Sequence, residues 1–161
     1  MIEGFLFVLT LVTAVACALV AGFFFAFSAC VMRALARLPA AQGMVAMQSI
    51  NVVVINPLVM AALFGTAVAC VVLVVASLVE WGDPYAVYVL VGGLLYLVGV
   101  ILLTLVYHVP RNDALAVLNP NDPDAERQWN RYVMTWTAGN HLRTVAPLAS
   151  ATLFAVALRV G

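Results

Sequence analysis

The sequence predicts an all-helical protein, a bundle of four transmembrane helices, and three observations lead to this fold class. Of the 161 residues, 66% are apolar and only 9% are charged, whereas soluble domains carry about a quarter charged residues. The mean hydropathy is +1.12. Four uncharged stretches occur, at residues 4–32, 52–79, 84–107 and 144–158. Crossing the hydrocarbon takes roughly 20 apolar residues, so the first three stretches suffice unaided. With no repeat or linker, residues 1–161 are predicted to form one domain.

The first stretch is predicted to be a retained helix and not a cleaved signal peptide. It has no basic residues before it, Glu3 stands at its start, and it exceeds the length of a signal peptide's apolar core. Small residues repeat in it at four-residue intervals, a pattern typical of closely packed membrane helices. These residues are Ala14, Ala18, Gly22, Ala26 and Cys30. Such a stripe also permits a homo-oligomer.

Residues 34–50 are mildly amphipathic, and we expect a short interfacial helix there. Asn51 and Asn56 then stand at the beginning of the second membrane helix. Asn51 fits a helix cap as well as it fits a binding role. Asn56 lies deep in the apolar run, so we expect it to find a partner inside the bundle and not to cap a helix.

The third stretch ends at His108, and residues 109–128 follow with a cluster of turn signals. Proline, asparagine and aspartate are concentrated at residues 119–123. We expect residues 109–128 to form a loop that covers the polar ends of the helices.

The fourth apolar stretch is short, so its helix is predicted to begin upstream. Six residues, most of them polar or aromatic, recur there at helical spacing: Trp129, Tyr132, Val133, Trp136, Asn140 and Arg143. A helix from about Trp129 to Arg159 would be roughly 45 Å long. Trp136, Asn140 and Arg143 share one face of this helix, and His141 lies about 100° from Asn140.

The distribution of arginine predicts the orientation. Six of the seven arginines flank the ends of the first and third helices and the beginning of the fourth: Arg33, Arg37, Arg111, Arg127, Arg131 and Arg143. The positive-inside rule therefore predicts an N-out, C-out topology. The absence of lysine and the wealth of alanine, valine and leucine favour a bacterial cytoplasmic (inner) membrane. Zero net charge and no basic stripe argue against nucleic-acid binding.

This topology places the polar residues of the spans near one face, the cytoplasmic side. Hydrocarbon offers no hydrogen bonds, so these side chains are expected to face one another or a wet cavity. They are Asn51, Asn56, His108, Asn112, Asn140, His141 and Arg143. Simpler roles compete with a site: an interfacial anchor for Trp129, a phosphate contact for Arg143, and a structural hydrogen bond for His108.

Short signatures of common enzymes are missing from the sequence. There is no phosphate-binding glycine loop, HExxH, CxxC or GxSxG. Cys17, Cys30 and Cys70 lie in apolar helices without paired spacing, which is typical of packing residues. No metal or organic cofactor is predicted. If a metal or haem is bound, His108 and His141 are its candidate ligands.

Four motifs resemble the anthrone oxygenase family of small membrane proteins. They are residues 27–32, the run 48–51 leading to Asn56 and Pro57, residues 109–113, and residues 136–144 with the sequence WTAGNHLRT. In the family a tryptophan often stands at the position of Gly139, so its absence here implies a wider pocket or a different substrate.

The resemblance implies a monooxygenase that oxidises a lipophilic hydroxyaromatic, an anthrone, to a quinone with O2. His108, ahead of His141, is the implied base, and Arg143, Asn140 and Asn112 would hold the developing oxyanion. Substrate contacts would come from Asn51, Asn56, Trp129 and Trp136. Two alternatives stay open: a metal- or haem-binding redox protein, and a non-catalytic membrane binding or assembly protein.

Overall fold

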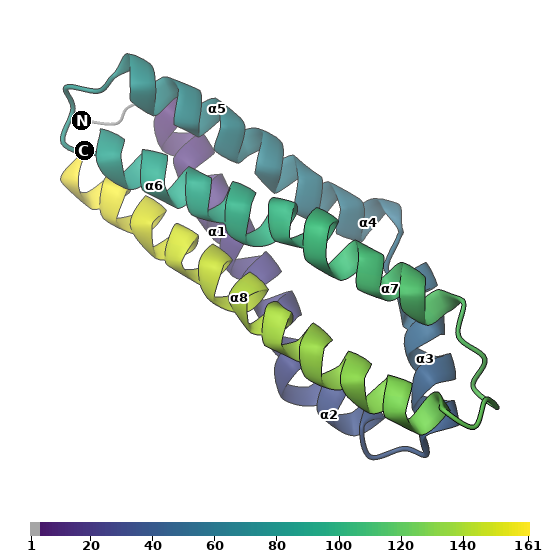
Figure 1. Cartoon of the computed structure of the whole chain (residues 1–161). Helices are drawn as coiled ribbons and strands as arrows, with labels where there is room; N and C mark the ends of the chain where they lie inside the picture. Colours follow the sequence, from purple (N-terminus) through teal and green to yellow (C-terminus); the bar gives the residue numbers. More distant parts are fainter. Residues whose placement is uncertain (1–3) are drawn as a thin grey trace.

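The computed structural model describes residues 4–161, and this part of the chain consists of helices and short connections without any strand. Four of its helices are long and apolar enough to cross a membrane (Figure 1). They span Gly4–Leu35, Pro57–Val79, Ala86–Ala116 and Ala125–Val160. The predicted four-helix membrane bundle is confirmed, and the fourth helix does begin upstream of its apolar stretch.

Wider π-helical turns interrupt three of the four long helices. The first helix comprises α1 (Gly4–Ala26), a π-helical segment (Phe27–Val31) and α2 (Met32–Leu35). The second comprises α4 (Pro57–Met60), a π-helical segment (Ala61–Gly65) and α5 (Thr66–Val79). The third comprises α6 (Ala86–Tyr96), π-helical segments (Leu97–Leu102, Thr104–His108) and α7 (Val109–Ala116). The fourth, α8 (Ala125–Val160), is continuous through Pro147.

The expected short helix is present as α3 (Ala40–Val53), but it extends past Asn51, and the second membrane helix begins at Pro57. Asn56 caps that helix: its Oδ1 accepts hydrogen bonds from the backbone N–H groups of Leu58 and Val59, both at 3.1 Å. Pro57 occupies the first turn, where its missing N–H costs nothing. The expectation that Asn56 is too deep to cap a helix is therefore wrong, because residues 54–56 are not helical and separate α3 from the second membrane helix.

The expected loop after His108 is half helical, which corrects the sequence prediction. The third membrane helix continues through Pro110 to Ala116, and only residues 117–124 connect it to α8. A proline is tolerated inside a membrane helix when a local π-helical adjustment rearranges the freed backbone groups. Here the π-helical segment Thr104–His108 directly precedes Pro110.

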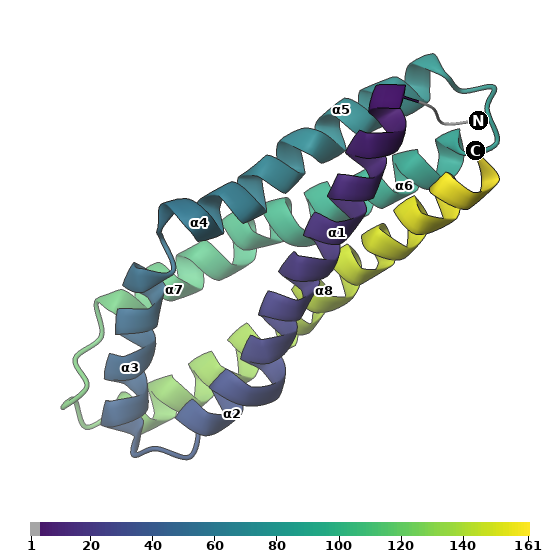
Figure 2. The same cartoon turned by 180° about the vertical axis from the view of Figure 1, so that it is seen from behind.

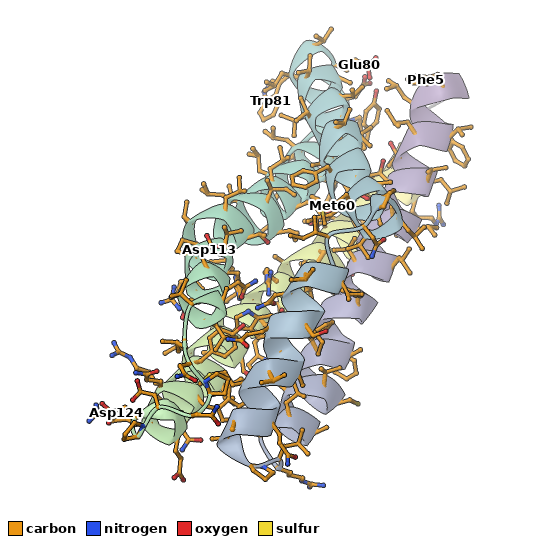
Figure 3. The ribbon with its side chains drawn as sticks, turned by 90° about the vertical axis from the view of Figure 1, so that its right-hand side faces the viewer. Phe5, Met60, Glu80, Trp81, Asp113 and Asp124 are labelled. Carbon is orange, nitrogen blue, oxygen red and sulfur yellow. The ribbon has the colours of Figure 1, made fainter. Side chains whose placement is uncertain are left out.

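The two ends of the bundle differ in the elements that form them (Figures 1 and 2). At the terminal end, α1 begins, α5 turns into α6, and α8 ends. At the opposite end, which we call the α3 end, α3 packs against α2, α7 and α8. Figure 3 shows Glu80 and Trp81 at the terminal end and Asp124 at the α3 end.

Two hydrophobic cores lie along the length of the bundle, one toward each end. The core toward the terminal end is built around side chains such as Cys17, Cys70, Tyr96 and Phe154. The core toward the α3 end is built around Met44, Met47, Leu115, Trp129 and Trp136. A group of buried polar side chains lies where α8 passes from one core to the other.

Candidate functional site

Asn140 and Arg143, one turn apart on α8, form the centre of the buried polar group. The Asn140 Nδ2 donates to the carbonyl oxygen of Phe24 and to the Oγ of Ser28, both at 2.8 Å. Its Oδ1 accepts from the Arg143 Nη2 at 2.9 Å. Because both amide atoms are engaged, Asn140 ties α1 to α8 and fixes the guanidinium.

The Arg143 guanidinium is buried without a counter-ion. Its relative exposure is 5%, and among residues 4–161 no carboxylate lies within 4.0 Å of it. Besides the bond to Asn140, it makes a long contact of 3.4 Å from Nη1 to the Thr104 Oγ1. Its carbon Cζ lies 4.4 Å from the ring centroid of Phe24, a cation–π geometry. The Nε has no hydrogen-bond partner within the described chain.

Asn112, on α7, is oriented by two aromatic residues of α8. Its Oδ1 accepts from the Trp136 Nε1 at 2.9 Å and from the Tyr132 hydroxyl at 3.0 Å. An indole N–H only donates, so the oxygen of Asn112 must face Trp136. The amide NH2 of Asn112 is thereby left available for another partner.

These residues line a small cavity of about 60 Å³ between α1, α3, α7 and α8, which we call the donor cavity. Its polar walls are Arg143, Asn112 and Asn51, and the Asn51 Nδ2 is buried without a hydrogen-bond partner among the described residues. Its apolar walls are Phe23, Phe24, Phe27, Met47, Ile50, Val54 and Trp136. The donor cavity therefore combines N–H donors with aromatic and aliphatic surface.

His108 is completely buried but does not line the donor cavity. Its ring nitrogens face the carbonyl oxygens of Leu103, at 3.3 Å, and Trp136, at 3.4 Å. Its ring packs edge-on against the indole of Trp136, with centroids 5.3 Å apart. His108 thus contacts Trp136, which lines the donor cavity, but does not line the cavity itself.

Gly139 allows this packing, because a Cβ there would lie 2.9 Å from the His108 ring and 2.5 Å from the Tyr107 ring. The space that a larger residue at position 139 would need is filled by these two rings. The missing tryptophan therefore does not leave an open pocket at this position.

His141 lies on a different surface of α8. It is exposed and lines a groove of about 390 Å³ between the first membrane helix and α8, together with Arg33 and Met134. Trp129 is buried in the core toward the α3 end, where it stacks on Tyr132. His141, Trp129 and Asn56 do not reach the donor cavity, whereas Asn51, Asn112, Trp136 and Arg143 line it, with Asn140 hydrogen-bonded to Arg143.

Several contributors to the site were missed by sequence reasoning. Ser28 and Thr104 are buried or half-buried hydroxyl residues of the first and third spans, both in π-helical segments. Their signal was a lone polar residue inside an apolar run, which is common for backbone-bonded Ser and Thr in membrane helices. Phe24 gave no signal, because aromatic residues are abundant in the first span. Phe27 and Ser28 lie in the motif 27–32 that resembles the family, but the sequence assigned them no role.

No group of three or more histidine, cysteine, aspartate or glutamate side chains that would hold a metal ion occurs among residues 4–161. His108 and His141 face different surroundings, one inside the bundle and one on the groove. The polar residues that converge are amides and a guanidinium, which bind anions and oxyanions.

Four membrane-length helices, three of which line the donor cavity together with α3, define an integral membrane protein with a polar site between its helices. The chain belongs to the anthrone oxygenase family, whose model, described as Anthrone oxygenase, matches residues 57–153. The family resemblance read from the sequence is confirmed. The matched region contains Asn112, Trp136, Asn140 and Arg143. Searches of curated proteins and of solved structures gave no match.

Proposed function

We propose that this protein is a membrane oxygenase that oxidises a lipophilic hydroxyaromatic of the anthrone class to a quinone with O2. The observation that carries the proposal is the buried Arg143, which has no counter-ion and shares the donor cavity with two amides. Preorganised donors in a dry site stabilise a developing oxyanion by several kcal/mol. Membership of the family supports the same reaction class.

The reaction balances without an organic cofactor. The ring methylene of the anthrone loses a proton, and the resulting anion spreads its charge onto the oxygen atoms of the rings. This anion passes one electron to O2, and the two radicals combine to form a carbon–oxygen bond and, after protonation, a hydroperoxide. Loss of the second hydrogen as a proton and cleavage of the O–O bond give the quinone carbonyl and one molecule of water.

The walls of the donor cavity contain no histidine, aspartate or glutamate. We therefore propose that the site selects the ionised form of the substrate, which has lost its proton to water before binding and whose oxygen pairs with Arg143, Asn112 and Asn51. His108, the base predicted from the sequence, then holds Trp136 against Asn112, and Asn140 holds the guanidinium. His141, on the groove, is assigned a role in substrate approach.

The donor cavity, at about 60 Å³, has room for O2 but is smaller than the roughly 300–1,000 Å³ of ordinary ligand pockets. One wall belongs to α3, through Met47, Ile50, Asn51 and Val54. Short non-helical connections flank α3 at residues 36–39 and 54–56. Its side chain Gln48 donates to the carbonyl oxygens of Leu115 and Leu118 at the end of α7. We propose that α3 moves away from α7 to admit the aromatic rings.

Oxygen uptake and quinone formation by the purified protein in lipid nanodiscs test the proposal, with an anthrone as substrate. The wild type is expected to turn over, and Arg143→Gln to lose about 10²–10³-fold in kcat, as expected for an oxyanion donor. Arg131→Gln, at an exposed arginine of the same helix, is the matched control. Binding of the anthrone without oxygen uptake by the wild type would contradict the proposal and favour a non-catalytic binding protein.

The cellular location is proposed as the cytoplasmic membrane of a bacterium, with the α3 end on the cytoplasmic side. Arg33, Arg37, Arg127 and Arg131 near that end support this orientation through the positive-inside rule. Labelling of single cysteines in intact cells tests it. A cysteine placed at Asn121 is expected to resist a membrane-impermeant reagent, and one placed at Gly82 to react.

A further inference from the structure

The donor cavity carries one formal charge, that of Arg143. Of the side chains that line it, none other than Arg143 is charged. Burying an unpaired cation is costly, and proteins compensate by placing an anion or several hydrogen-bond acceptors beside it. Arg143 receives one amide oxygen at 2.9 Å and one hydroxyl oxygen at 3.4 Å. This compensation is incomplete, because its Nε finds no acceptor in the described chain.

The two amides of the donor cavity add to this imbalance. The Asn112 oxygen is already engaged by Trp136 and Tyr132, which leaves its NH2 as the free group. The Asn51 Nδ2 is buried and has no partner within residues 4–161. A guanidinium and two amide N–H groups, contributed by α8, α7 and α3, thus share one cavity. This arrangement matches the chemistry of an anion-binding site.

The size of the donor cavity limits the anion. A cavity of roughly 10–15 Å³ holds one water molecule. The donor cavity, at about 60 Å³, therefore accommodates a halide or a linear triatomic anion. The aromatic rings of Phe24, Phe27 and Trp136 line the cavity on its apolar side. A larger organic anion, the ionised substrate included, fits only when α3 moves as proposed above.

We propose that the donor cavity is a binding site for a small monovalent inorganic anion, such as chloride or bromide, held by Arg143, Asn51 and Asn112. The anion neutralises the buried guanidinium in the resting protein. It also competes with the ionised substrate, and this second statement rests on the proposed function. Binding of the anion itself does not depend on any catalytic activity.

Thermal unfolding in nanodiscs tests the binding, with sodium bromide replacing sodium gluconate at constant ionic strength. A ligand that binds only the folded state raises the unfolding midpoint by mass action, so bromide is expected to raise it by a few degrees and to saturate. Gluconate is too large for the donor cavity unless α3 moves, and its hydrated hydroxyl groups do not match the apolar walls, so it serves as the reference anion. A midpoint that does not respond to bromide, or that shifts linearly without saturation, would overturn the proposal.

Two variants locate the binding site. Asn51→Asp supplies a carboxylate on the wall that Arg143 shares. It is expected to abolish the saturable shift while the protein stays folded. Arg143→Gln is expected to do the same, whereas Arg131→Gln keeps the wild-type response. A full bromide response in Asn51→Asp would place the anion elsewhere and overturn the proposal.

Steady-state kinetics separates the anion site from the proposed oxygenase activity. Bromide is expected to raise the KM for the anthrone without changing kcat. Turnover that is insensitive to bromide would overturn the competition. A saturable bromide shift in a protein that consumes no oxygen would overturn the proposed function and leave the anion site standing.

Discussion

The two cores of the bundle use buried polar groups in different ways. Toward the terminal end, serine and threonine hydroxyl groups bond to their own helix, as Thr13 does to the Leu9 carbonyl oxygen at 2.7 Å and Ser150 to that of Ala146 at 3.0 Å. The Tyr96 hydroxyl is different, because it donates to the Leu63 carbonyl oxygen of the second helix at 2.9 Å. Toward the α3 end, side-chain bonds join different helices, as between Asn140 and Phe24 or between Trp136 and Asn112. A hydrogen bond within one helix satisfies a hydroxyl group, so that the helix can be buried in an apolar core. The bonds between helices toward the α3 end place donors around a cavity.

The comparison also distinguishes how the two regions are packed. Near the terminal end, glycine brings backbones together, since a Cβ on Gly93 would lie 2.5 Å from a Val74 methyl group. Near the α3 end, aromatic rings and methionines fill the space, and a cavity remains beside Arg143. We infer that the first region mainly provides stability and that the second trades packing for a binding site.

The largest expected effect on stability comes from Phe154→Ala in the terminal core. Phe154 is fully buried and contacts Gly92, and deleting such a ring costs about 3–5 kcal/mol. We expect a large fall in the unfolding midpoint, with unchanged kcat in the molecules that stay folded. A loss of kcat without loss of stability would contradict the inference that this core mainly provides stability.

Trp136→Phe tests the second region with a smaller change. The substitution removes the N–H that orients Asn112 but keeps an aromatic wall for the donor cavity. A hydrogen bond of this kind contributes about 1 kcal/mol, so we expect kcat to fall by about tenfold or less and stability to change little. Tyr132→Phe, which removes the other donor to Asn112, is the matched control and is expected to act in the same direction.

His108→Gln distinguishes a base from a group that positions Trp136. If His108 holds Trp136 through packing, as proposed, the variant is expected to lose less than about tenfold in kcat. General-base catalysis contributes about 10²–10⁴-fold. A loss of that size in a folded variant, recovered by raising the pH to ionise the substrate in solution, would restore His108 as the base predicted from the sequence.

The smallest effect is expected for His141→Ala. This side chain is exposed on the groove and makes no side-chain hydrogen bond within the described residues. We expect kcat to stay within about twofold of the wild type and stability to change by less than about 0.5 kcal/mol. A loss of turnover comparable with that of Arg143→Gln would move the reaction from the donor cavity to the groove.

Much of the fold followed from the sequence, because hydropathy and length determine which segments span a membrane. The helical spacing of Trp136, Asn140 and Arg143 also predicted correctly that they share one face of α8. The break at residues 54–56 escaped prediction, because an apolar run hides a helix boundary when asparagine supplies the cap. The continuation of the third helix through Pro110 was also not predicted. Proline is normally a turn signal, and the sequence does not show the π-helical turn before Pro110 that allows the helix to continue.

The positions of the two histidines show what a sequence pattern leaves open. Both lie on membrane-length helices, yet His108 packs against the indole of Trp136 and His141 lines the groove. Depth along a helix follows from residue number, whereas the direction of a side chain depends on which helices are neighbours. The roles predicted for His108 and His141 therefore stay predictions that only the variants test.

The absorption spectrum of a bound hydroxy-substituted quinone tests the central claim most directly. Ionisation of its phenol shifts the visible band to longer wavelength, so the spectrum reports the charge of the bound ligand. At a pH where the free quinone is neutral, the wild-type protein is expected to bind it with the spectrum of the anion, and Arg143→Gln to bind it in the neutral form or not at all. A neutral spectrum on the wild type, or the same anionic spectrum on Arg143→Gln, would contradict the assignment of Arg143 as the group that holds the oxyanion.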